Sequence, residues 1–255
     1  MDYEIRVGKY DFKTRKMPEI KGFENLLVHV KDPLSPYVLK TENGCIMENV
    51  WQFSKIYKMV FEQKQTLHRW TKEEGWCHPA ETHIDEKGNI TPQYWLWRNK
   101  GFNFQHPVRY PNGYHGRTKC VGVVVRRDLL TNIPDPEITR KVTVIDGRVD
   151  YVLVPPEYFY VTRRCVYYNV YVTLARRIDQ FHQLQRNIFS GTKYQTVEVD
   201  GPRKAEDYPF NLADDNSLLL ARDTARGWLN NRSQSFGHGV CLAIALINKD
   251  EWINI

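Results

Sequence analysis

The strongest constraint on the fold is the irregular order of two kinds of segment along the chain. Runs rich in Val, Ile, Thr and Tyr predict strands, and runs with apolar residues three and four positions apart predict helices. The predicted strands are residues 25–30, 120–125, 141–145, 148–155 and 194–200. The predicted helices are residues 46–62, 164–189, about 216–230 and 237–247. Because strands and helices do not alternate strictly, the pattern predicts an α+β fold with helices around a small, mostly antiparallel sheet.

The chain predicts a single domain. Its 255 residues, with 42% hydrophobic content, are enough to bury a substantial core. Residues 63–118 carry Gly, Pro, His and Trp without a steady period, and irregular segments of that length often serve as lids or binding loops. No repeat or low-complexity tract marks a linker. We therefore expect one domain over residues 1–255 with a loop-rich insertion at about 63–118.

Composition excludes several classes of protein. The first twenty residues are charged throughout, and no window reaches the ~18 apolar residues of a membrane span. The five cysteines are far apart and never in a CxxC spacing, which argues against a disulfide framework or a zinc ribbon. His78 and His83 are five positions apart and lack the HExxH order, so no metal site is predicted. We expect a soluble protein of the cytoplasm, or of the host cytoplasm if the chain is viral, that needs no cofactor.

The net charge of +6 permits an anionic partner. Arginine pairs at 126–127, 163–164 and 176–177 are typical of surfaces that contact phosphate. A solvated basic surface is the simpler explanation, and both interpretations stay open at this point.

The predicted helix at 46–62 carries an unusual polar face. Glu48, Gln52 and Lys55 follow one another at i, i+4 and i+7, so a helix would place all three on one side. An exposed stripe with Glu and Lys at these spacings would give ordinary helix support of about 0.2–0.5 kcal/mol. A functional face is the alternative.

Residues 34–57, "LSPYVLKTENGCIMENVWQFSKIY", resemble the signature of the NADAR family. That family has an FSNF stretch, a short hairpin and a helix that opens with a pattern like E-H-x-x-Q-x-x-K. Residues 34–37 stand at the FSNF position, and Glu48, Gln52 and Lys55 match the E, Q and K. Asn49 replaces the usual His. A weaker similarity covers residues 230–246, so the chain is identified as a divergent member of the family.

The resemblance implies an N-glycosidase that cleaves the C1'–N bond of an ADP-ribose-like or nucleotide-derived glycoside, including ADP-ribose on guanine bases of DNA or RNA. Cleavage of such a bond develops positive charge on the ribose, which Glu48 would stabilise, or Glu48 would orient the attacking water. Lys55 would keep Glu48 ionised or meet a substrate oxygen, and Gln52 would fix a ribose hydroxyl or the water. The family's habits would place such a chain in a phage or another mobile element.

Aromatic and basic side chains would complete a nucleotide site. His238 would lie at a helix start, where it would either approach a phosphate or cap and pack the helix. Ser35 and Tyr37 resemble the family's nucleotide-side contacts. The predicted substrate-binding residues are Ser35, Tyr37, Trp51, Trp95, Arg98, Tyr114, His115, Arg117 and His238.

Two other functions stay open. Residues 110–118, "YPNGYHGRT", resemble the His-Gly start of some ADP-ribosyltransferase NAD-binding motifs, with Tyr168 and Glu198 as guessed partners. A non-enzymatic basic protein that binds nucleic acid or associates with virions is the second alternative, and it predicts a freely exposed Glu48. No membrane partner is expected, and the oligomeric state is open.

Overall fold

The computed structural model describes residues 3–11, 13–65, 72–113, 119–130, 143–145, 147–199, 201–202, 216–231 and 236–247. Its contacts group into two compact units. One, the terminal unit, combines Met1–Ser35 with Tyr168–Ile255, and the other, the middle unit, is Pro36–Tyr167. The sequence predicted one domain, whereas the structure inserts one compact unit between the two halves of the other.

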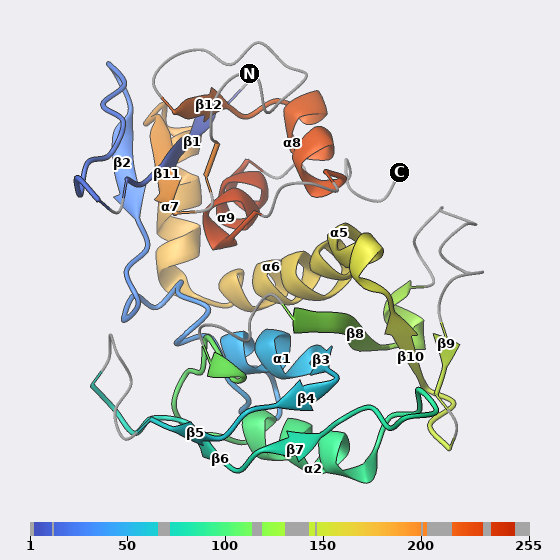
Figure 1. The fold of residues 1–255 in the computed structure, drawn as a ribbon. Coiled ribbons are helices and arrows are strands. Elements are labelled where there is room, and N and C mark those ends of the chain that lie inside the picture. The colour runs from blue at the N-terminus through green and yellow to red at the C-terminus, as the bar shows by residue number, and fades with distance from the viewer. Residues whose placement is uncertain are drawn as a thin grey trace. The chain divides into compact units, whose positions relative to one another are not determined.

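The terminal unit is built on a four-stranded sheet with the order β12-β1-β11-β2 (Figure 1). β1 pairs in parallel with β11, β11 pairs in parallel with β2, and β12 joins β1 antiparallel. The strands are β1 (Ile5–Lys9), β2 (Glu24–Leu27), β11 (Tyr194–Glu198) and β12 (Ser217–Leu219). The helices of this unit are α6 (Asn169–Ala175), α7 (Asp179–Phe189), α8 (Arg222–Leu229) and α9 (His238–Leu246).

Helix α9 is the buried helix of the terminal unit and packs against β11 and β1. It is apolar on all sides, as expected for a helix without a solvent face. The buried Glu198 carboxylate accepts hydrogen bonds from the Gly237 and Gly239 N–H groups, at 3.2 and 2.8 Å. A Cβ at Gly237 would lie 2.4 Å from Glu198 Oε2, so only glycine allows this approach. A negative side chain thus satisfies N–H groups at the positive end of the helix.

The middle unit contains an antiparallel four-stranded sheet with the order β3-β8-β10-β9. Two short antiparallel pairs, β4 with β7 and β5 with β6, accompany it. The strands are β3 (Lys55–Tyr57), β4 (Met59–Val60), β5 (Gln63–Lys64), β6 (Cys77–His78), β7 (Glu81–Thr82), β8 (Cys120–Arg126), β9 (Thr143–Val144) and β10 (Tyr151–Val154). The helices are α1 (Met47–Ser54), α2 (Pro92–Phe102) and α5 (Phe159–Thr162), with the 3-10 turns η2 (Arg127–Leu130) and η3 (Pro156–Tyr158), and the π-helical segment η4 (Arg163–Tyr168) runs on to α6.

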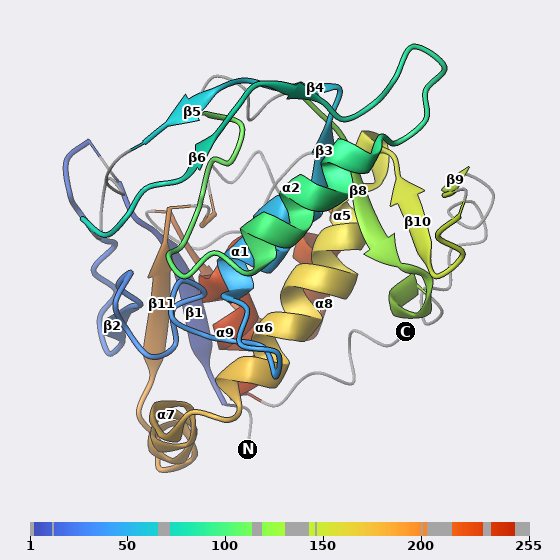
Figure 2. The same cartoon turned by 90° about the horizontal axis from the view of Figure 1, so that it is seen from below.

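An aromatic core holds α1, α2 and the sheet of the middle unit together. The Phe53 ring lies 4.6 Å from the rings of both Trp76 and Trp97, and the α2 backbone passes so close that a Cβ at Gly101 would meet Phe53 at 2.1 Å. Figure 2 shows α2 running alongside α1. Buried aromatic rings of this kind give most of the packing energy available to a unit of this size.

The α+β class with mostly antiparallel strand pairing is confirmed, but three helix predictions are corrected. The helix predicted at 46–62 ends at Ser54, because the apolar residues that follow pair with β8 as strand β3. The run 164–189 is divided between η4, α6 and α7. The segment 216–230 begins as strand β12, and only its second half is helix α8.

Among the elements that lie where the sequence predicted none are β1 and α2. β1 is a central strand, buried from Ile5 to Gly8. α2 lies within the segment 63–118 and begins with Pro92 at its first position, where proline is favoured. The strands predicted at 141–145 and 148–155 are present as the antiparallel pair β9 and β10. No helix in the described part of the chain is long and apolar enough to cross a membrane.

Candidate functional site

The three polar residues singled out in the sequence form a hydrogen-bonded row. Gln52 Nε2 donates to Glu48 Oε1 at 2.8 Å, and Lys55 Nζ donates to Gln52 Oε1 at 2.8 Å. Glu48 is only 5% exposed and Gln52 only 8%. We call this set of three residues the Glu48 row. Glu48 and Gln52 are buried and Lys55 is partly buried, so the row is not the solvated helix stripe that ordinary helix support would predict.

Lys55 reaches the row from outside the helix. It is the first residue of β3, with the extended backbone angles φ −70° and ψ 147°, and it pairs with Val123 of β8. The amide of Gln52 bridges the charges at its two ends, because one end of an amide donates and the other accepts. The direction of both hydrogen bonds therefore fixes the order carboxylate, amide, ammonium.

The surroundings of Lys55 shift its acidity. Burial lowers the pKa of Lys55 to about 8, the negative charges of Cys120 and Glu48 oppose that shift, and the positive charges of Arg163 and Arg109 reinforce it. Burial also raises the pKa of the Cys120 thiol, which Lys55 opposes. The ammonium lies 5.1 Å from the centre of the Trp51 ring, at cation–π distance. Lys55 therefore exchanges its proton closer to neutral pH than an exposed lysine does.

The π-helical segment η4 brings two further side chains to Trp51. The Arg163 guanidinium carbon lies 6.0 Å from the centre of the Trp51 ring, and the Tyr167 ring lies 5.6 Å from it in an edge arrangement. π-helical turns are rare and occur frequently at functional sites. The wider turn of η4 places Arg163 and Tyr167 on the same aromatic side chain of α1.

Tyr37 and Arg109 complete the charged surroundings of Glu48. Burial raises the pKa of Tyr37, the Glu48 charge raises it further, and the Arg109 charge and hydrogen bond oppose both. The Arg109 guanidinium also lies 5.4 Å from the centre of the Tyr110 ring. The carboxylate is therefore accompanied by a hydrogen-bonded phenol and by the positive charges of Lys55 and Arg109.

Asn49 fixes the segment that carries Arg109. Its Nδ2 donates to the carbonyls of Phe104 and His106, both at 3.0 Å, and its Oδ1 accepts from Val108 N–H at 2.7 Å. The side chain is fully buried, and every hydrogen bond it makes reaches this one segment. Asn49 thus positions this segment next to Glu48.

Trp95 and Arg98, predicted to bind substrate, lie elsewhere in the middle unit. Arg98 stacks over the Trp95 ring at 5.7 Å and over Tyr151 at 5.0 Å. Tyr151 pairs with Arg126, so strand alternation places it on the sheet face opposite Lys55, which pairs with Val123. The structure brings Glu48, Gln52, Lys55, Trp51 and Tyr37 together and places this pair on the other face.

The other predicted residues are outside this cluster or outside the described part. Ser35 ends the first segment of the terminal unit and is buried, with its N–H bonded to Asp32. His238 begins α9 of the same unit, with its ring 6.2 Å from that of Tyr171. Tyr168 and Glu198 of the transferase alternative also belong to the terminal unit. Tyr114, His115 and Arg117 lie outside the described residues.

Sequence reasoning missed three neighbours of Lys55 and Trp51. Arg163 and Tyr167 follow the predicted strand at 148–155, and Cys120 begins the predicted strand at 120–125, so none is close to Glu48 in the sequence. Only the arginine pair 163–164 carried a signal, as one of three pairs that could meet an anion. Their place in the site depends on β-sheet pairing and on the π-helical turn.

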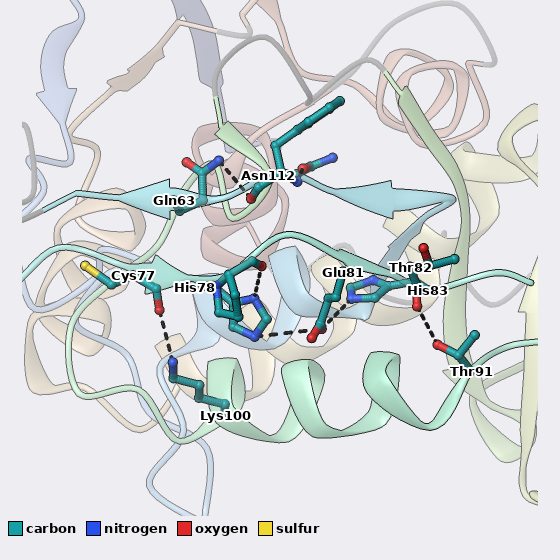
Figure 3. A network of polar contacts seen from close by, with 11 residues as sticks. Gln63, Cys77, His78, Glu81, Thr82, His83, Thr91, Lys100 and Asn112 are labelled. Carbon is teal, nitrogen blue, oxygen red and sulfur yellow. Dashed lines mark hydrogen bonds and ion pairs between the residues drawn. The ribbon is translucent and has the colours of Figure 1, made fainter.

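A second polar cluster lies between β6, β7 and α2 (Figure 3). Glu81 Oε1 lies 2.9 Å from His83 Nε2 and 3.7 Å from His78 Nε2. Burial and, to a smaller extent, the charge of His78 lower the pKa of His83 to about 4. Lys100 of α2 donates to the Cys77 carbonyl at 3.0 Å and ties the helix to β6. In the described ranges no group of three or more His, Cys, Asp or Glu residues is arranged to hold a metal ion.

Comparison of the chain with protein-family models, with curated proteins and with solved structures found no match.

Proposed function

We propose that this protein is an N-glycosidase that hydrolyses the C1'–N bond of an ADP-ribose-like or nucleotide-derived glycoside, with Glu48 as the carboxylate that faces the ribose. The observation that carries the proposal is the buried Glu48 row, in which Gln52 links the carboxylate to Lys55 at 2.8 Å on each side. Carboxylates and ammonium groups are rarely buried unless they are paired or functional. The spacing of the three residues also carries the family resemblance.

The reaction develops oxocarbenium character at C1' as the bond to nitrogen breaks. A carboxylate in a water-poor site stabilises that charge more strongly than one in water, because the effective dielectric is lower. In this proposal Glu48 supplies the negative charge or orients the attacking water. Gln52 uses its amide to hold Glu48 and Lys55 in place, so it acts as a positioning residue more than as a substrate contact.

The cations of the site suit a substrate that carries phosphate. Lys55 and Arg163 both lie over the Trp51 ring, and Arg109 bonds Tyr37 close to Glu48. A guanidinium group can donate two parallel hydrogen bonds to two oxygens of one phosphate. An aromatic ring beside it can pack against a ribose or a base. These groups support an anionic nucleotide glycoside over a neutral sugar.

The burial of Glu48 also bears on the choice between functions. A protein that only contacts nucleic acid backbone would leave this carboxylate exposed, whereas it is 5% exposed. For the transferase alternative, the Glu198 carboxylate is engaged by the N-terminal N–H groups of α9. These observations favour the glycosidase proposal over both alternatives.

A substrate panel tests the proposal. Purified protein is incubated with guanine-ADP-ribosylated DNA, the corresponding RNA, NAD and free nucleotides, and the release of ADP-ribose or base is followed by chromatography. We expect turnover of at least one of these glycosides by the wild type and strongly reduced turnover by Glu48→Gln. A protein that binds ADP-ribose without cleaving any glycoside, or that is unaffected by Glu48→Gln, would refute the assignment.

A further inference from the structure

A cluster of arginine and aromatic side chains on the flank of α2 has no part in the proposed reaction. The Arg98 guanidinium carbon lies 4.5, 5.0 and 5.7 Å from the ring centres of Phe102, Tyr151 and Trp95. The Arg148 guanidinium carbon lies 4.7 Å from the Trp95 ring centre, and the Trp95 and Tyr151 rings are 5.4 Å apart. We call these five residues the arginine–aromatic cluster.

The two guanidinium groups of the cluster contact ring faces, and among the described residues neither forms an ion pair with a carboxylate. Within the described part of the chain, Arg98 Nε is buried and has no hydrogen-bond acceptor. A buried donor without an acceptor costs about 1–3 kcal/mol, and an anionic ligand would offer Arg98 the acceptor that the described residues do not.

Of the Arg98 guanidinium nitrogens, only Nε is among the buried atoms without a partner, so the Nη groups form the edge that can meet a ligand. A guanidinium that lies over a ring keeps its N–H groups in the plane of the guanidinium, where they point past the ring edge. Both arginines contact the same Trp95, so two such edges lie close together. Each guanidinium can donate two hydrogen bonds to one phosphate, so two adjacent guanidinium groups can bind two consecutive phosphates of one strand.

The surface around the cluster offers flat and apolar area as well as charge. Trp95 and Tyr151 are half-buried, and Leu96 and Val149 beside them are 72% and 70% exposed. Unpaired bases stack on aromatic side chains and bury apolar surface, whereas the carboxylates of an acidic peptide would use only the arginines. The net charge of +6 adds attraction for a polyanion.

We propose that the arginine–aromatic cluster is a binding surface for single-stranded nucleic acid, with backbone phosphates at Arg98 and Arg148 and an unpaired base against the exposed part of Trp95 and Tyr151. The surface lies on the sheet face opposite Lys55, so the proposal does not rest on the glycosidase activity. It assigns a polymer contact to a region that the Glu48 row does not reach.

The test measures the binding of a fluorescently labelled, unmodified 20-nucleotide single strand by anisotropy, as DNA and as RNA, at several salt concentrations. Arg98→Gln/Arg148→Gln is compared with Lys87→Gln/Arg222→Gln, which removes the same charge from exposed positions. We expect at least a tenfold loss of affinity in the first double variant and less than a twofold loss in the second. The log–log salt slope should become shallower by about 1.4 in the first, as expected when two single-strand phosphate contacts are lost.

A third variant separates stacking from charge. Trp95→Leu should lose roughly tenfold in affinity for the oligonucleotide, the scale of one stacked base, and much less for an abasic strand of equal length. Thermal unfolding of every variant confirms that the fold is retained. No binding by the wild type, equal loss in both double variants, or equal affinity for poly-glutamate would overturn the proposal.

Discussion

Val108 N–H donates to Asn49 Oδ1 at 2.7 Å, and this hydrogen bond ties the segment before Arg109 to the residue after Glu48. Because Asn49 also donates to the carbonyls of Phe104 and His106, one buried amide sets the path of that segment. The charge that accompanies Glu48 therefore depends on a residue that itself has no charge.

Asn49→Ala should destabilise the middle unit by about 3 kcal/mol, because it leaves one buried donor and two buried acceptors without partners. Asn49→Asp should be at least as harmful, since a carboxylate would face two carbonyl oxygens. Urea unfolding measures both. Asn99→Ala on the exposed side of α2 is the matched control, expected within about 0.5 kcal/mol of wild type. Equal stability of Asn49→Ala and Asn99→Ala would contradict the positioning role.

Glu48→Gln should reduce turnover by roughly 10²–10³ while changing substrate binding little. The amide can still accept the hydrogen bond from Gln52 Nε2, so the variant removes charge and preserves the row. Single-turnover rates and calorimetric titration with ADP-ribose separate the two effects. Lys58→Ala, at an exposed position in the turn after β3, serves as the control and should retain wild-type values of both.

The activity should decline at alkaline pH with a midpoint near 8, if the reaction needs the Lys55 ammonium. The pKa of Lys55 is lowered to about 8 by burial, so the proton is present below this pH and lost above it. Lys55→Arg keeps a positive charge over the whole range, and the alkaline decline should move beyond pH 10. The pH–rate profile of kcat/KM is measured for the wild type and for Lys55→Arg. An unchanged midpoint in Lys55→Arg would assign the decline to another group.

The stability of the protein should fall as pH decreases from about 6.5 to 4 because of His83. Burial lowers its pKa in the folded state from the ordinary value of 6.5 to about 4, so the unfolded chain takes up the proton first. Protonation of the unfolded chain then lowers the free energy of unfolding by an amount on the order of 3 kcal/mol. This destabilisation is absent above pH 7, where the unfolded chain does not take up the proton.

The measurement for His83 is urea unfolding at pH 7 and pH 4.5 with wild type and His83→Gln. The variant should lose less stability between the two pH values than wild type does, although it is less stable at pH 7 because the hydrogen bond to Glu81 is altered. His182→Gln at an exposed position should behave as wild type. An identical pH dependence in wild type and His83→Gln would show that His83 is not responsible.

The sequence by itself determined the α+β class and the set of polar residues at the centre of the site. Strand-like and helix-like runs are local patterns, and β8, β11, α7 and α9 lie within runs predicted from them. The intervals between Glu48, Gln52 and Lys55 are also local, so their proximity was predictable. Their geometry was not, because the helix ends at Ser54 and Lys55 joins the row as a strand residue.

Only the tertiary structure decided what surrounds that row. Arg163 and Tyr167 reach Trp51 through a π-helical segment, and Arg109 reaches Tyr37 because Asn49 holds the preceding backbone. Strand alternation placed Trp95 and Arg98 with Tyr151 on the other face of the sheet. β1 was not predicted, because its five residues show no clear strand pattern and form a strand by pairing with β11 and β12, which are distant in the sequence. Periodicity predicts which residues are neighbours along one helix or strand, whereas sheet register and long-range hydrogen bonds decide which segments are neighbours in space. The free energy that stabilises those long-range contacts comes from pairs of segments, so no single segment reveals it.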